Sequence, residues 1–161
     1  MYEDRIEYRQ YQQKQTQNQN EPKRINTQHL DSLINRQPSH QIKNIKPFDK
    51  NIELKFIVLS KSPPIKTKQG TIMTPMIIAD STGCIQMNVF DDYGTFIQES
   101  NTCYTQNAYA TMYKDRLILY QGKQGILKQL SDYFFDFKTK PNISDQNWSE
   151  YLASKQNNNM N

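Results

Sequence analysis

A succession of short β-type runs, separated by turn residues, constrains the fold of this chain more than any other feature. The first run spans residues 51–60 and reads NIELKFIVLS, with apolar side chains at every second position. This two-residue alternation is typical of a strand that buries one face. The face expected to be buried carries Ile52, Leu54, Phe56 and Val58.

Four more strands are expected, at residues 71–79, 84–90, 102–113 and 117–121. Asp80-Ser81-Thr82-Gly83 supplies turn residues between the second and third strands, and Lys114-Asp115-Arg116 turns the last pair. Residues 61–70 contain two prolines and three lysines and are expected to form an exposed loop, whereas residues 91–98 favour a short helix. Five strands with a helix between the third and fourth predict an all-β fold, a five-stranded OB-fold barrel.

The two ends of the chain differ from this region in composition. Residues 1–44 contain 14 glutamines or asparagines and few apolar residues, which predicts a disordered arm. The OB-fold domain is expected over residues 45–144, and a short helix with a disordered tail over 145–161. Ser144 is the expected cap of that helix, while residues 126–137 are apolar without a clear period.

Composition excludes several classes of protein. No stretch approaches the roughly 20 apolar residues that a membrane helix needs, and Met1 to Gln10 lacks the apolar core of a secretory signal. The two cysteines, Cys84 and Cys103, have neither metal-site spacing nor the context of a disulfide framework. A formal net charge of +4 is compatible with a polyanionic partner but decides little by itself.

Strand alternation places four aromatic rings on faces opposite the expected core. Phe90 shares its face with Gln86 and Asn88, while Ile85, Met87 and Val89 face inward. Tyr109 and Tyr113 lie with polar neighbours, and Tyr120 joins them if the hairpin register permits. Rings in such positions offer stacking platforms for unpaired bases, each worth ~1–3 kcal/mol.

Basic residues flank these rings on the two loops that border the oligonucleotide face of OB-folds. The expected contacts are Lys66, Thr67 and Lys68 on one loop, and Lys114, Arg116 and Lys123 near the other. Aromatic residues also suit strands for reasons unrelated to binding, which is a sufficient account of any single ring. Four rings together with flanking cations favour a binding groove.

The same residues carry a resemblance to a known family. Its segments, in order, are Ile45-Lys46-Pro47, Phe56-Ile57-Val58-Leu59, Lys66-Thr67-Lys68, Ala79-Asp80, Thr82-Gly83, Asp91-Asp92, Leu119-Tyr120 and Pro141-Asn142. Over residues 45–144 the chain resembles the SOSS-B family, the simple eukaryotic single-stranded DNA-binding proteins of the SOSS complex, which have one OB-fold. Where Phe90 and Tyr113 stand, that family typically has tryptophan and phenylalanine.

The resemblance implies a function, a location and partners. It implies sensing of single-stranded DNA in the nucleus during the DNA damage response and double-strand break repair. It also implies an Integrator-type scaffold subunit and a small third subunit as partners, with Asp132 and Tyr133 on the scaffold-binding surface. The family's stacking rings fall on the four aromatics identified above.

Two other classes of function compete with this hypothesis. Residues 45–144 contain no histidine, and Asp91-Asp92 is a simple helix start, so no enzyme and no cofactor are expected. An RNA-binding OB-fold stays open, because stacking and phosphate contacts do not read the 2′-hydroxyl. A protein-interaction module without nucleic-acid binding stays open as well.

Overall fold

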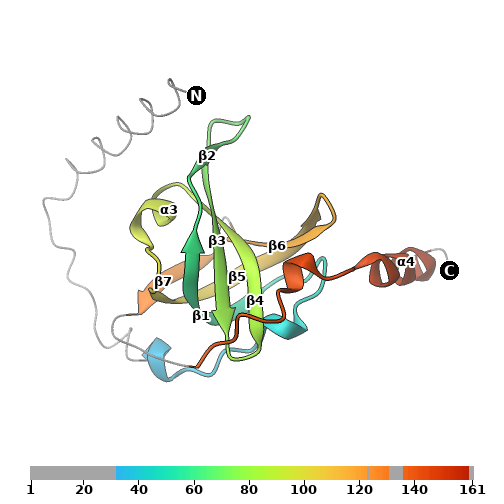
Figure 1. Ribbon diagram of the computed structural model, residues 1–161, viewed down its shortest axis with the longest axis horizontal. Helices are drawn as coiled ribbons and strands as arrows, with labels where there is room; N and C mark the ends of the chain where they lie inside the picture. Colours follow the sequence, from blue (N-terminus) through green and yellow to red (C-terminus); the bar gives the residue numbers. More distant parts are fainter. Residues whose placement is uncertain (1–31, 123, 131–135, 160–161) are drawn as a thin grey trace, which may run out of the picture. The chain divides into compact units, whose positions relative to one another are not determined.

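Figure 1 shows the computed structural model of the chain, which divides into two units, Met1–Ser32 and Leu33–Asn161. Ser32 is the single described residue of the first unit, so the fold described below is that of the second unit. The predicted disorder of residues 1–31 lies outside the described residues. The structure describes residues 32–122, 124–130 and 136–159.

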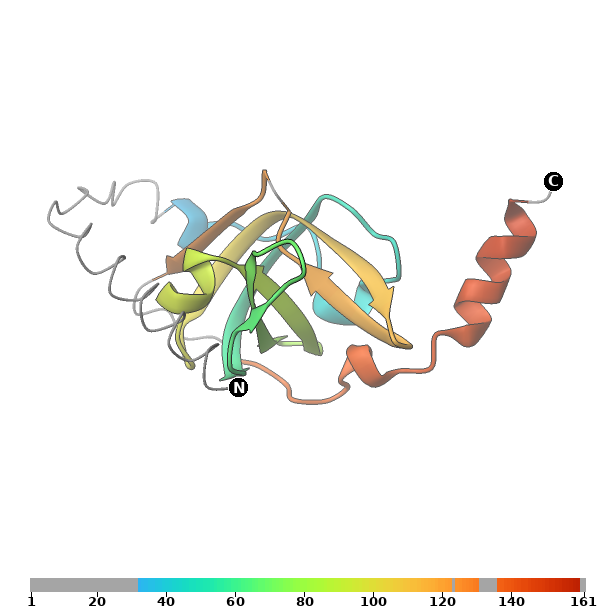
Figure 2. The same cartoon turned by 90° about the horizontal axis from the view of Figure 1, so that it is seen from above.

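Seven strands pair into one sheet. The strands are β1 (Ile52–Lys61), β2 (Ile65–Lys66), β3 (Ile72–Asp80), β4 (Gly83–Phe90), β5 (Thr102–Tyr113), β6 (Arg116–Tyr120) and β7 (Ile126–Leu130). Five of them form a closed circuit of neighbours, β1–β3–β4–β6–β5 and back to β1, in which β4–β6 is parallel and the other pairs are antiparallel. Figures 1 and 2 show these strands wrapped around a common interior.

The sheet exceeds the five strands that the sequence predicts. All five predicted strands are present, and a short helix, α3 (Asp92–Phe96), lies where one was expected between the third and fourth. The additional strands are β2, which pairs with β3 inside the predicted exposed loop, and β7, which pairs with β5. The chain is therefore mostly β, with a few short helices.

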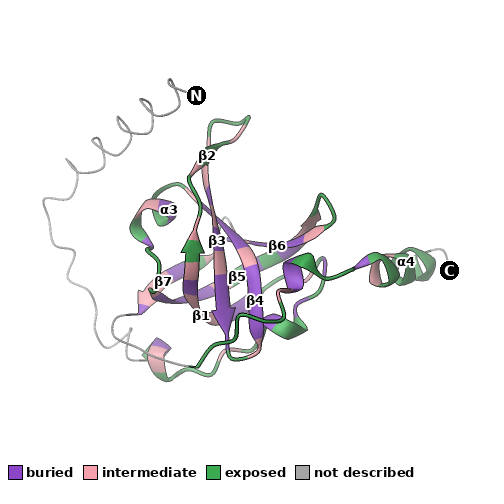
Figure 3. Ribbon diagram, viewed as in Figure 1, coloured by how far each residue is buried: buried purple, intermediate pink, exposed green. Residues whose placement is uncertain are grey.

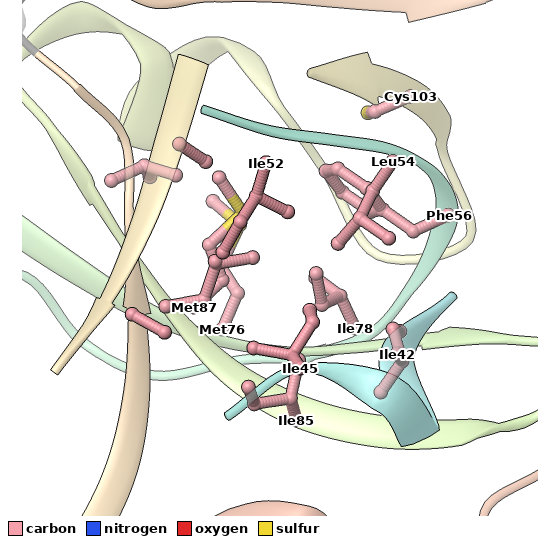
Figure 4. Packing of buried hydrophobic residues seen from close by; sticks show 14 of the residues in the cluster. Ile42, Ile45, Ile52, Leu54, Phe56, Met76, Ile78, Ile85, Met87 and Cys103 are labelled. Atoms are coloured by element: carbon pink, nitrogen blue, oxygen red, sulfur yellow. The ribbon is translucent and has the colours of Figure 1, made fainter. Parts of the chain in front are cut away.

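The alternation of the strands builds the core. Ile52, Leu54, Phe56 and Val58 of β1 are buried, as the sequence predicts. Figure 4 shows several of these side chains packed against Met76, Ile78, Ile85 and Met87 from β3 and β4. Figure 3 shows the buried residues concentrated in the strands and the exposed ones at the tips of the hairpins.

The domain begins earlier than the sequence predicts. The 3-10 helix η1 (Ile42–Asn44) buries Ile42 completely, although residues 33–44 were assigned to the arm. The Asp80 carboxylate accepts hydrogen bonds from the backbone N–H groups of Ile42 and Thr82, each at 2.8 Å. One side chain therefore holds both η1 and the β3–β4 turn, and the domain starts at Leu33 rather than at Ile45.

An ion pair holds the start of this domain against β1. Glu53 is only 6% exposed, and Arg36 donates to both of its carboxylate oxygens, at 2.8 and 3.0 Å. A buried carboxylate needs such a partner, because leaving it unpaired is strongly destabilising. His40 adds a backbone hydrogen bond to the carbonyl of Glu53 at 3.2 Å.

The predicted role of Ser144 as a helix cap is wrong. Ser144 lies in a second 3-10 helix, η2 (Ile143–Asp145), where its hydroxyl donates to the carbonyl of Leu117 at 2.6 Å. The same hydroxyl accepts from the backbone N–H of Gln86 at 2.8 Å. Ser144 therefore bridges β4 and β6, and the expected helix is a later segment, α4 (Ser149–Asn158).

Gly83 lets the segment before η2 approach the sheet. A Cβ at this position would lie 2.7 Å from the carbonyl oxygen of Pro141, closer than side chains tolerate. The neighbouring Cys84 donates its backbone N–H to that same oxygen at 2.9 Å. The glycine in the predicted turn therefore serves packing as well as the turn itself.

Replacing Ile42 by alanine tests the corrected boundary. Because Ile42 is fully buried, we expect Ile42→Ala to lower the free energy of unfolding by about 2–5 kcal/mol in chemical denaturation. Ile65→Ala is the matched control, since Ile65 is 50% exposed and its loss should stay within about 0.5 kcal/mol. Equal, small losses of unfolding free energy at both positions would show that η1 is not part of the folded domain.

Candidate nucleic-acid interface

Three of the four predicted rings form one row on the outer face of the sheet. The rings of Tyr109 and Tyr120 are stacked, with centroids 5.5 Å apart and planes 13° from parallel. The ring of Phe90 continues the row on the other side of Tyr120, at 6.3 Å and 19°. Tyr109 is 38% exposed, and Phe90 and Tyr120 are half-buried.

Strand register explains why these rings meet. Tyr120 of β6 lies opposite Tyr109 in the antiparallel pair with β5, and opposite Asn88 in the parallel pair with β4. Phe90 stands two residues beyond Asn88, on the same face of β4. Because β6 lies between β4 and β5, it places Tyr120 between the other two rings.

Tyr113 lies on the same strand as Tyr109, but its ring contacts a cation, whereas that of Tyr109 stacks on a second ring. Its ring is 58% exposed, and the ammonium nitrogen of Lys114 lies 5.4 Å from the ring centroid, within the range of a cation–π contact. Lys114 and Asp115 form the two-residue turn of the β5–β6 hairpin, and both have positive φ, 48° and 63°. The tight turn thus presents a ring and a cation together at the hairpin tip.

A polar network supports the aromatic row from within the sheet face. Asn88 is 3% exposed, and its side-chain oxygen accepts from the amide nitrogen of Gln86 at 3.0 Å, while its own amide nitrogen lies 3.4 Å from the sulfur of Met73. Burial raises the pKa of the Tyr120 phenol, against an opposing hydrogen bond from Asn88. The phenol therefore stays neutral at physiological pH, and no phenolate charge repels a phosphate.

A groove of about 740 Å³ opens beside the row. Phe90 and Tyr109 form one side of this groove, and the start of α3 and the segment after β6 form others. Its remaining lining residues are Thr67, Gln69, Thr71, Asp91, Asp92, Tyr93, Gln121 and Gly122. The tip of the β2–β3 hairpin therefore borders the aromatic surface, as the sequence predicts for this loop.

The predicted cations occupy several different settings. Lys66 and Lys68 are exposed at the β2–β3 tip, and Thr67 between them lines the groove. Thr67 also shapes the tip, since its hydroxyl accepts from the backbone N–H of Thr71 at 3.2 Å. Lys114 is exposed at the other hairpin, which in Figure 1 extends at the upper right.

The side chain of Arg116 forms its polar contacts with other residues of the protein. Its guanidinium donates to Asp145 at 2.8 Å and to the side-chain oxygen of Gln86. It therefore links η2 to the polar network beneath the rings, a structural role that its charge alone did not indicate. The remaining predicted contacts, Lys123, Asp132 and Tyr133, lie outside the described residues.

Several lining residues were absent from the sequence-based site, and Gln121 and Tyr93 are among them. Gln121 ends the predicted fifth strand and is 7% exposed, and Tyr93 lies on α3 and is 39% exposed. Strand parity placed Gln121 on the inward face with Leu117 and Leu119, whereas the structure ends β6 at Tyr120, and parity says nothing of Tyr93 on α3. Their position next to Phe90 and Tyr109 depends on how α3 and the segment after β6 pack.

The described residues include neither a metal-binding cluster nor an activated thiol. No group of histidine, cysteine, aspartate and glutamate within them is placed to hold a metal ion. Burial raises the pKa of the Cys103 thiol to about 12, and burial followed by the charge of Asp145 raises that of Cys84. Neither thiol is therefore suited to act as a nucleophile. No described helix is long and apolar enough to cross a membrane.

The fold is similar to those of known OB domains. No protein-family model matches the chain. A hypothetical protein from Arabidopsis thaliana, known from its solution structure, superposes with a TM-score of 0.58 at 20% identity, over 70% of this chain and 88% of that one. The OB domain of a Thermoplasma acidophilum protein superposes with a TM-score of 0.50 at 14% identity, over 63% of this chain and 93% of that one. These likenesses show that the chain has an OB-type fold.

Proposed function

We propose that this chain binds single-stranded DNA with little dependence on sequence, by stacking bases on the rings of Phe90, Tyr120 and Tyr109. The row of nearly parallel rings on the outer face of the sheet carries this proposal. An aromatic row on an OB-type sheet is the arrangement with which such folds bind unpaired bases. Every base has a π-face, so stacking tolerates any sequence.

The setting of the rings supports binding over a purely structural role. Rings that served the core would lie inside the sheet with Leu117 and Leu119, which are fully buried. The row instead lies on the opposite face, and the ring of Tyr113 extends the exposed aromatic surface toward the hairpin tip. Exposed apolar surface of this kind commonly marks an interaction site.

Cations near both ends of the surface suit the phosphates of a bound strand. Lys66 and Lys68 are exposed at the β2–β3 tip, and Lys114 is exposed at the β5–β6 tip. Lysine contacts to phosphate hold the strand in place without reading its sequence. The strand would then run between the two hairpins with its bases over the rings.

The wider role that we propose rests on the resemblance to the SOSS-B family. It comprises a nuclear function in the DNA damage response and double-strand break repair. It includes an Integrator-type scaffold subunit and a small third subunit as partners, with Asp132 and Tyr133 on the scaffold-binding surface. Co-purification of the tagged chain with such subunits after DNA damage, and its loss in a variant with alanine at both positions, tests this role.

A binding comparison tests the proposed substrate. Because a duplex hides the faces of its bases, we expect at least about tenfold weaker binding to duplex DNA than to a single strand of the same sequence, measured by fluorescence anisotropy. Competition with RNA of that sequence identifies the sugar that the site prefers. Equal affinity for single strand and duplex would contradict stacking. Tighter binding of RNA would identify RNA, and not DNA, as the ligand.

Removal of individual rings tests the mechanism. We expect Phe90→Ala, Tyr109→Ala and Tyr120→Ala each to weaken single-strand binding by ~1–3 kcal/mol, about 5- to 150-fold, because each removes a stacking platform. Phe96→Ala is the matched control, since Phe96 is 65% exposed on α3 and lies outside the row. Tyr120→Phe keeps the ring and should retain affinity within about twofold. Undiminished binding by folded alanine variants, checked by thermal melting, would refute the stacking mechanism.

A further inference from the structure

Beyond the aromatic rings, the groove is lined by residues whose side chains carry hydrogen-bond acceptors. Phe90 and Tyr109 border it on one side, and the carboxylates of Asp91 and Asp92 and the amide of Gln121 line it beyond. No lysine or arginine is found among its described lining residues. A group that donates hydrogen bonds would suit the acceptors of Asp91 and Gln121 in this part of the groove.

Gln121 contributes a buried acceptor to the lining of this groove. Its side chain is 7% exposed, and its Oε1 is buried without a hydrogen-bond partner in the described part of the chain. A buried acceptor without a partner destabilises a protein, so each such atom needs an explanation. The terminal amide of glutamine turns about a broad torsion, so the oxygen can face a ligand through a side-chain rotation alone.

Asp91 is held in place at the edge of the groove by two contacts with β3. Its backbone N–H donates to the carbonyl of Ile72 at 2.8 Å, and its carboxylate lies 3.4 Å from the backbone nitrogen of the same residue. Its φ of 52° lies in the left-handed region, which is uncommon for residues other than glycine. The strand therefore positions this carboxylate next to Phe90 rather than leaving it on a mobile loop.

We propose that this groove receives one base of the bound strand and selects bases that carry an exocyclic amino group. Resting on the proposed single-strand function, this inference adds one selective position to a row of rings that accepts any base. Carboxylate and amide oxygens accept hydrogen bonds from the amino groups of cytosine and adenine, whereas thymine and uracil present carbonyl oxygens there.

Two homopolymers that differ only at the base edge test the selection. Oligonucleotides of 5-methyldeoxycytidine and of thymidine share the methyl group, and differ in the 4-amino group against the 4-oxo group and in N3. We expect the natural chain to bind the 5-methyldeoxycytidine strand about fivefold more tightly, the lower limit for a good base-edge contact. Fluorescence anisotropy at one salt concentration gives the ratio of the two dissociation constants.

Substitutions within the groove assign the selection to its residues. Gln121→Met keeps the length of the side chain and removes the acceptor, so the ratio should fall toward one while the thymidine strand still binds. Gln156→Met is the matched control, because Gln156 is exposed on α4 and its loss should leave the ratio unchanged. Asp91→Asn adds an amide donor and should lower the ratio further. A charge effect alone would strengthen binding of both strands equally and would contradict the inference.

The results separate this inference from the proposed function. Tight binding of both strands with a ratio of one would overturn the selection and leave stacking intact. A ratio of about fivefold that persists in Gln121→Met and Asp91→Asn would place the selection elsewhere and also overturn it. Failure of the natural chain to bind either strand would refute the single-strand function itself.

Discussion

The position of β6 between β4 and β5 is the constraint on which the candidate site depends. Its antiparallel register with β5 sets Tyr120 opposite Tyr109, and its parallel register with β4 sets Tyr120 opposite Asn88. A slip of one residue would turn Tyr120 into the core and Leu119 out of it. Core packing by Leu117 and Leu119, both fully buried, therefore maintains the aromatic row on the other face.

Alternation predicted much of this arrangement from the sequence. The inward positions of β1 and the outward positions of Phe90, Tyr109 and Tyr113 follow from a period of two, because successive strand side chains point to opposite faces. The inclusion of Tyr120 needed the register of the hairpin, which depends on the two-residue turn at Lys114 and Asp115. The order of the row depends on long-range pairing, which one strand cannot reveal.

What the sequence could not predict depends on contacts between distant segments. Ile42 stands among polar residues, and its side chain packs in the core where a hydrogen bond from its backbone to Asp80 positions it, which no local period reveals. The sequence predicted a helix cap at Ser144 and a phosphate contact at Arg116. Because η2 packs against β4 and β6, both side chains instead form hydrogen bonds with Gln86. Gln121 gave no signal, because an unpartnered amide is recognised only from its surroundings.

The most direct measurement of the central claim is an NMR titration of the aromatic side chains with a short single strand. Bases that stack on the row place their ring currents over the protons of Phe90, Tyr109 and Tyr120. We therefore expect the largest upfield shifts on these three rings and none on Phe137, which is 44% exposed. Its neighbour Lys138 is hydrogen-bonded to Asp80, at the end of β3 opposite to the one that pairs with Phe90. Saturable binding that leaves the three rings unshifted would contradict the claim that they form the binding surface.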